Sequence, residues 1–171
     1  MSENKAIKGW CARRAKAEAK KDTIPLSKRA GSVVGVVASL LILLFFVVHQ
    51  TSSTGFFTSK FGPAETFLFY APALFSLATT GAKAFVGRKN VLRPFEAFNL
   101  GLFTVAFVWL FVVFPFDFSH FADVLPDFLQ FLVQWISNDI AKVLMAIGII
   151  VTPVMTVYTA ALYVFVRRKL S

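Results

Sequence analysis

Cysteine and histidine are scarce in this chain of 171 residues, which contains one cysteine and two histidines. Because Cys11 is alone, the chain cannot form an internal disulfide or a metal cluster held by several cysteines. We interpret Cys11 as an ordinary thiol, with palmitoylation close to a membrane as the alternative. The sequence also lacks a glycine-rich phosphate loop, an H-E-x-x-H pair and a G-x-S-x-G turn, so no enzyme class is indicated by a motif.

Acidic residues are few, with nine against eighteen lysines and arginines, and the formal net charge is +9. Such a balance can indicate nucleic-acid binding, but the basic residues here lie at the ends of apolar runs rather than on one soluble face. We therefore expect no nucleic-acid partner. Anionic lipid headgroups at the cytoplasmic face are the expected counter-charge.

Hydrophobic residues are abundant, at 57% of the chain, and they include 21 phenylalanines. The stretch GSVVGVVASLLILLFFVVHQ, residues 31–50, carries no charge as far as Val48. At about 1.5 Å per residue, a helix of this length matches a hydrocarbon core of roughly 30 Å. This stretch therefore predicts a first membrane span, and the protein is expected to be integral to a membrane, most simply the plasma membrane.

Three further apolar runs predict three more spans, and the expected fold is all-α, an integral membrane four-helix bundle. Pro63 and Pro94 are expected to open the second and third helices, whereas Pro72 and Pro153 are expected to bend helices from within. The predicted spans cover residues 31–49, 64–86, 95–114 and 140–166. The predicted organisation is a basic arm (1–30), the transmembrane domain (31–166) and a basic tail (167–171).

The distribution of basic residues predicts which ends face the cytoplasm. Nine of them lie in residues 1–30, four in residues 83–93 and three in residues 167–169. The two segments predicted to lie outside contain only Lys60 and Lys142. Since lysine and arginine accumulate on the cytoplasmic side of spans, both termini are predicted to be cytoplasmic.

The segment between the third and fourth spans has no lysine or arginine from residue 115 to 139 but contains four aspartates. Its polar residues after Pro126 fall on one narrow arc at helical spacing. We therefore predict an amphipathic interfacial helix over about residues 126–137, on the extracytoplasmic side. Trp135 in this helix, and Trp10 in the basic arm, are predicted to lie at the membrane interface; a solvated tail is the alternative for the arm.

Small and weakly polar residues recur at helical spacing in three of the spans, which is typical of close helix packing in membranes. The predicted packing residues are Gly31, Gly35, Ser39, Ser76, Thr80, Gly148, Thr152, Thr156 and Thr159. The sequence does not decide whether their partners lie in this chain or in another. Phenylalanine-rich faces predict lipid-exposed surface, with a site for a quinone or a lipid tail as the alternative.

Two polar residues, Glu96 and Asn99, lie one turn apart at the inner end of the third span. They indicate either a polar site at the cytoplasmic boundary or a structural arrangement. In the structural arrangement Glu96 pairs with Arg93 and the amide bonds to a neighbouring helix.

One group of side chains has the chemistry of a metal site. His49, Glu65, Asp117 and His120 are all predicted near the outer interface, and two imidazoles with two carboxylates suit zinc, copper or iron. Their spacing over three segments matches no known ligand pattern, so chance proximity in the sequence is the competing interpretation.

The predicted function is that of a structural or accessory subunit acting through helix and lipid contacts. The expected partners are other membrane proteins or further copies of the chain. The alternatives are a passive transporter of small solutes or lipids and a membrane enzyme using the outer histidines. No ionisable residue lies near the middle of a predicted span, which argues against a proton-coupled pump. The sequence indicates no particular cofactor.

Overall fold

The computed structural model describes residues 23–170, with the side chains of residues 168–170 left out of that description. Trp10 and residues 1–22 of the predicted basic arm therefore lie outside the described residues. The described chain is helical and contains no β-strand, only the isolated bridges Thr23–Arg88 and Phe57–Phe116. Its long helices are α2 (Leu26–Thr51), α3 (Pro63–Val86), α4 (Lys89–Val113) and α6 (Asn138–Leu170). The short elements η1 (Phe118–His120) and α5 (Asp127–Gln130) lie between α4 and α6.

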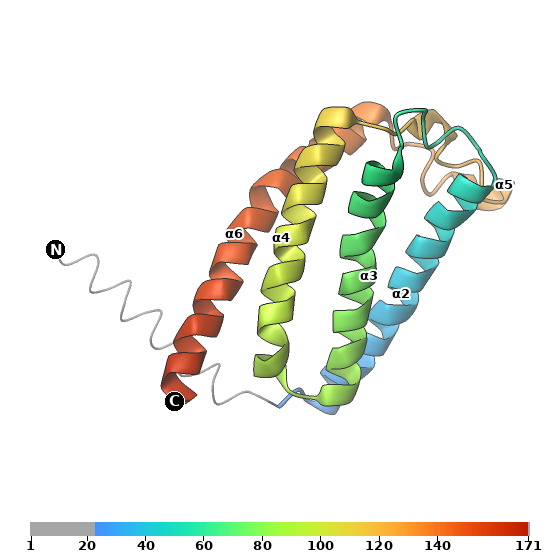
Figure 1. Ribbon diagram of the computed structural model, residues 1–171. Helices are drawn as coiled ribbons and strands as arrows, with labels where there is room; N and C mark the ends of the chain where they lie inside the picture. Colours follow the sequence, from blue (N-terminus) through green and yellow to red (C-terminus); the bar gives the residue numbers. More distant parts are fainter. Residues whose placement is uncertain (1–22, 171) are drawn as a thin grey trace.

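The long helices pack in chain order, α2 against α3, α3 against α4 and α4 against α6 (Figure 1). Within residues 23–170, α2 and α6 do not pack extensively against each other. We call the end of the helices that carries residues 52–62 and 114–137 the loop end. The opposite end, where α3 turns into α4 at Gly87 and Arg88, is called the turn end.

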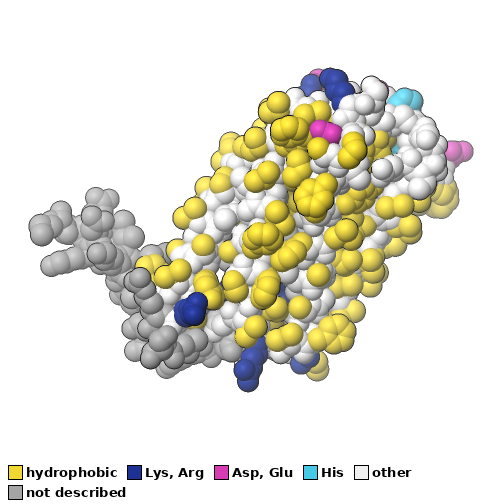
Figure 2. All heavy atoms as spheres, viewed as in Figure 1, with side chains coloured by type: hydrophobic (Ala, Val, Ile, Leu, Met, Phe, Trp, Pro, Cys, Tyr) yellow, Lys and Arg dark blue, Asp and Glu magenta, His cyan; other side chains and the backbone are white. Residues whose placement is uncertain are grey.

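Three of these helices, α2, α4 and the part of α6 from Asn138 to Arg167, are long and apolar enough to cross a membrane. None of the most apolar segment of α2 is buried inside the molecule. Figure 2 shows hydrophobic side chains spread over the visible surface of the helices. Soluble monomers rarely expose apolar surface on this scale, and three helices able to cross a membrane are typical of a membrane protein.

Local sequence explains where α3 begins and ends. Pro63 occupies the first helical position, where its missing N–H costs no helical hydrogen bond. The backbone N–H of Gly62 donates to Glu65 Oε2 at 3.0 Å and satisfies one group at the helix start. At the other end, Gly87 has φ +65°, a left-handed conformation that glycine adopts without steric cost. Helix α3 therefore covers residues 63–86, and the span predicted over residues 64–86 lies within it.

The other long helices begin before their predicted starts. Helix α2 starts at Leu26, because the carbonyl of Pro25 accepts from the N–H groups of Lys28 and Arg29 at 3.0 and 3.1 Å. Helix α4 starts at Lys89, so the expectation that Pro94 opens this helix was wrong. Pro94 lies inside the second turn instead, where it removes the hydrogen bond that a residue there would donate to the carbonyl four residues earlier.

The predicted interfacial helix over residues 126–137 is much shorter than expected. Regular α-helix covers only Asp127–Gln130, and the chain continues as turns. Most of the following hydrogen bonds join residues three apart, including Leu132 N–H to the carbonyl of Leu129 at 3.1 Å. Such tight turns do not propagate into a long helix. Trp135 is exposed in this segment, and its indole N–H donates to the carbonyl of Leu132 at 2.8 Å.

Candidate functional site

The two connections at the loop end are joined to each other by backbone hydrogen bonds. Asp117 N–H donates to the carbonyl of Phe56 at 2.8 Å, and Thr58 N–H donates to the carbonyl of Pro115 at 3.0 Å. We call this pairing, which includes the bridge between Phe57 and Phe116, the loop clasp. It fixes the α2–α3 connection against the segment that follows α4.

An aromatic cluster lies beneath the loop clasp, centred on Phe56, which is 1% exposed. Its ring lies 5.5 Å from the ring of Phe116 and 5.2 Å from that of Phe118. Ring contacts of this kind favour a fixed geometry because the edge and face of a ring carry opposite partial charges. The cluster therefore forms a rigid apolar cap over the helices at the loop end.

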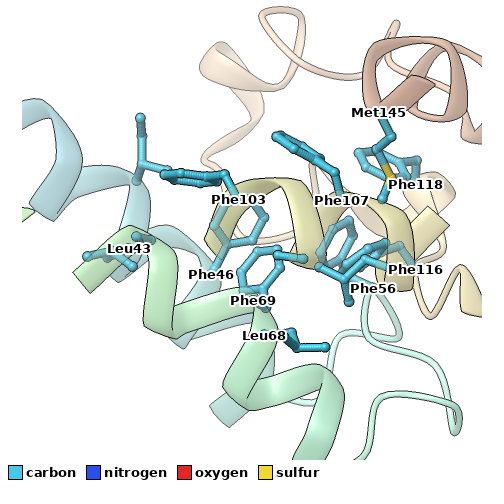
Figure 3. Close-up of a pocket in the computed structure, with 14 residues that line it drawn as sticks. Leu43, Phe46, Phe56, Leu68, Phe69, Phe103, Phe107, Phe116, Phe118 and Met145 are labelled. Carbon is cyan, nitrogen blue, oxygen red and sulfur yellow. The ribbon is translucent and has the colours of Figure 1, made fainter. Parts of the chain in front are cut away.

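Below this cap lies an apolar pocket with a volume of about 240 Å³ (Figure 3). All four long helices and both connections contribute to its wall. The lining residues are Ile42, Leu43, Phe46, Phe56, Leu68, Phe69, Ala73, Phe103, Ala106, Phe107, Leu110, Phe116, Phe118 and Met145. None of these side chains carries a hydrogen-bonding group other than the weak thioether of methionine, so the pocket suits an apolar ligand.

The pocket is only partly enclosed. Its wall includes Ile42 of α2 and Met145 of α6, two helices that do not pack extensively against each other in the described chain. Ile42 is 58% exposed although it lines the pocket, which places it at the opening. The pocket is thus covered at the loop end but accessible from the side, between the helices.

The size of the pocket is energetically important. If a void of 240 Å³ were sealed and empty, it would cost on the order of 6 kcal/mol, at about 24 cal/mol per Å³. Apolar cavities larger than a benzene ring stay free of water but admit apolar molecules. Because the pocket is partly open, this figure is an upper bound, and the apolar lining suits a hydrocarbon group better than water.

His49, one of the predicted metal ligands, is 1% exposed and has a structural role in this arrangement. Its Nε2 lies 3.2 Å from the carbonyl oxygen of Phe121, and its Nδ1 lies 2.6 Å from Thr54 Oγ1. Because a carbonyl can only accept, Nε2 carries the proton, and in the neutral ring Nδ1 accepts from the Thr54 hydroxyl. The imidazole thus ties the end of α2 to both connections.

The other three predicted metal ligands each have a separate partner. His120 Nδ1 lies 2.8 Å from Asp123 Oδ2, and Trp109 Nε1–H donates to Glu65 Oε1 at 2.8 Å. Asp117 accepts from the hydroxyl and the backbone N–H of Ser119, which lowers the pKa of this carboxyl. Within residues 23–170, no group of three or more metal-binding side chains could hold an ion. The geometry gives no support to a metal centre formed by these four residues.

Several of the predicted packing residues meet within the chain. A Cβ at Gly35 would lie 3.6 Å from Thr80 Cγ2, and one at Gly148 would lie 3.0 Å from the ring of Phe107. Thr104 Oγ1 donates to Thr152 Oγ1 at 2.9 Å, which joins α4 to α6.

The remaining packing residues are placed differently. Thr156 donates to the carbonyl of Thr152 at 2.8 Å, within its own helix. Ser39 and Ser76 are half-buried, and a Cβ at Gly31 would have no neighbour within 4 Å. Thr159 lines a small polar pocket beside Glu96.

Charged side chains connect the helices at the turn end. Lys83 Nζ lies 2.8 Å from Glu96 Oε1 and joins α3 to α4. Arg29 donates to the carbonyls of Ala84 and Phe85 at 2.7 and 3.1 Å, which fixes the start of α2 against the end of α3. In the predicted structural arrangement, Glu96 pairs with Arg93. The structure shows Glu96 paired with Lys83, because α3 and α4 are antiparallel and the end of α3 lies beside the start of α4.

Sequence reasoning did not locate the apolar pocket. It interpreted the phenylalanine-rich stretches chiefly as lipid-facing surface, and periodicity alone does not separate rings that point into a cavity from rings that point outward. The one available signal was the density of phenylalanine in both connections, at residues 56, 57, 61, 114, 116, 118 and 121. The two connections contain more phenylalanine rings than anchoring at a membrane interface requires.

Comparison with models of known protein families, with curated proteins and with solved structures finds no match to this chain.

Proposed function

We propose that this protein is an integral membrane protein with four spans and both ends in the cytoplasm, and that it acts as a structural or accessory subunit through helix and lipid contacts. The argument for a fourth span depends on α3. This helix has 24 residues and packs between α2 and α4, both of which can cross a membrane. At about 1.5 Å per residue it is roughly 36 Å long, so a chain that crosses in α2 and again in α4 returns through α3.

Charge at the turn end supports the proposed orientation. The start of α2 and the α3–α4 turn bring together Lys28, Arg29, Lys83, Arg88, Lys89 and Arg93. The residues of the loop end include only Lys60 and, in the first turns of α6, Lys142. An excess of this kind favours the cytoplasm for the turn end.

The observation that carries the subunit proposal is the exposure of α2. Within the described residues, α3 is the one long helix against which α2 packs extensively, and α2 presents bulky side chains such as Leu40, Leu41 and Leu44 outward. Helix association in a membrane requires a surface that another helix can approach, and α2 offers the least occupied one in the described chain.

The alternatives predict different cavities and sites. A passive transporter of polar solutes needs a continuous polar path between α3 and α6, whereas the pocket beneath the aromatic cap is apolar and reaches α2. This favours lipid handling over solute transport as the second candidate function. A membrane enzyme would depend on His49 or His120, and replacement of both without loss of any deletion phenotype would rule out this third possibility.

The proposal is tested by extracting the tagged protein from its native membrane in mild detergent and identifying what migrates with it by mass spectrometry. A photoreactive residue at Leu41 reports contacts of α2, and one at Val112, an exposed residue of α4, is the control. A subunit gives a stoichiometric partner that crosslinks at Leu41 and not at Val112. Migration alone, with crosslinks to lipid only, would contradict the subunit proposal and favour the lipid-handling alternative.

A further inference from the structure

We propose that the apolar pocket holds one hydrocarbon chain of an anionic phospholipid from the surrounding bilayer, with the lipid headgroup beside Lys142. The inference rests on the membrane placement proposed above but does not require a protein partner. It names a ligand for a pocket that the subunit function leaves unused.

The wall of the pocket determines the chemistry of the chain. Its side chains are aliphatic or aromatic, so a polar group inside would lose its hydrogen bonds to water without replacement. The volume of about 240 Å³ exceeds that of cavities that admit a benzene-sized molecule. A flexible alkyl chain fits the irregular space between Phe46, Phe69 and Phe103, which Figure 3 shows on three different helices.

The direction of access identifies the source of the chain. Phe56, Phe116 and Phe118 cover the pocket at the loop end, and the loop clasp holds them in place. The open side lies where Ile42 is exposed, on α2, whose apolar surface faces outward. A ligand entering here comes from the hydrocarbon layer and not from water.

Lys142, three residues before Met145 of the pocket wall, favours a negatively charged headgroup. The ammonium of Lys142 lies 4.7 Å from the ring centroid of Phe114, whose ring lies 6.0 Å from that of Phe116 in the pocket wall. Met145, which lines the pocket, follows Lys142 by one turn of α6.

The charge of Lys142 is available to a ligand. Asp139 lies one turn before it on α6, yet no ion pair joins any carboxylate of the described residues to this ammonium. An amphiphile with its chain in the pocket and a phosphate at Lys142 satisfies both features at once.

The experiment uses the full chain in nanodiscs composed mainly of phosphatidylcholine. A minor share is phosphatidylglycerol that carries a diazirine on one acyl chain, and labelled residues are identified by mass spectrometry. A chain bound in the pocket labels residues such as Leu43 and Met145 and saturates as the share of phosphatidylglycerol rises. Bulk lipid labels exposed residues such as Val105, and that label rises in proportion to the share.

Two pairs of variants separate the pocket from the headgroup. Ala106→Phe places a ring in the pocket and is expected to lose the saturable label, whereas Val105→Phe adds the same ring to the exposed face and keeps it. Lys142→Gln is expected to weaken the preference for phosphatidylglycerol over phosphatidylcholine about fivefold. Lys60→Gln, at the other basic residue of the loop end, leaves this preference unchanged.

The outcomes distinguish this proposal from the proposed function. If Ala106→Phe fails to fold, the saturation curve of the unaltered protein still decides whether a pocket site exists. Proportional labelling at every residue overturns the lipid site while leaving the subunit proposal intact. A saturable label with an unchanged lipid preference in Lys142→Gln overturns the assignment of the headgroup. Release of the protein from native membranes by alkaline carbonate overturns the membrane placement and both proposals together.

Discussion

Replacing Phe56 by alanine is expected to cause one of the largest losses of stability available in this protein. The side chain is 1% exposed, and its ring contacts His49 at 4.9 Å and Phe116 at 5.5 Å between centroids. Truncating a buried phenylalanine to alanine typically costs about 3–5 kcal/mol, because the transfer energy is lost and a cavity remains. Aromatic pairs add about 0.5–1.5 kcal/mol beyond burial. We expect a loss near the upper end of the range, because Phe56 has several ring partners.

The assay is unfolding of the purified protein in mixed micelles, followed by tryptophan fluorescence as a denaturing detergent is added. Phe128→Ala is the matched control, since Phe128 also lies at the loop end, in the connection between α4 and α6, but is 73% exposed. The control is expected to change stability by less than about 0.5 kcal/mol. Equal losses in the two variants would refute the inference that Phe56 organises the loop end, because burial would then have no bearing on the cost.

Three further predictions concern the helix contacts and the loops. Gly148→Leu is expected to lower the free energy of unfolding by about 1–3 kcal/mol through overpacking, because even a Cβ added there would lie 3.0 Å from the Phe107 ring. An unchanged unfolding midpoint would contradict this prediction. Thr104→Val is expected to lower the free energy of unfolding by about 0.6 kcal/mol. Its hydrogen-bond partner is Thr152, at 2.9 Å, so in a double-mutant cycle the variant with both threonines replaced by valine should lose less stability than the sum of the two single variants. The pKa of Asp117 is lowered below its ordinary 3.8 by hydrogen bonds from the hydroxyl and the backbone N–H of Ser119. Its contribution to stability is therefore present above pH 3.8 and lost as pH falls through the lowered pKa, a dependence that Asp117→Asn should remove in thermal unfolding measured against pH.

The sequence was sufficient to predict the long helices because the signals for them are local. A run of uncharged residues marks α2, and the proline and glycine that bracket α3 define its ends to within one residue. Pro94 gave a false start for α4, because the helix begins at Lys89 and contains the proline in its second turn, where one backbone hydrogen bond is lost. Local signals also exaggerated the interfacial helix, where periodicity indicated a dozen residues and the chain forms four in regular α-helix followed by turns.

The site was harder to predict because its contacts join distant parts of the sequence. Phe57 and Phe116 form a bridge although they are separated by two complete helices. His49 and His120 both lie at the loop end, yet each ring has its own hydrogen-bond partner. Which side chains share a cavity depends on helix rotation and on loop pairing, and neither can be read from composition.

The loop clasp also sets an order of events during biogenesis. Ribosomes make the chain from its N-terminus, so the α2–α3 hairpin is complete before Pro115 and Asp117 are synthesised. The backbone groups of Phe56 and Thr58 lack these hydrogen-bond partners until α4 has been synthesised. The hydrogen bonds of the loop clasp are thus a late step in folding. Until they form, Phe56 lacks Phe116 and Phe118, the two rings that share the cap with it.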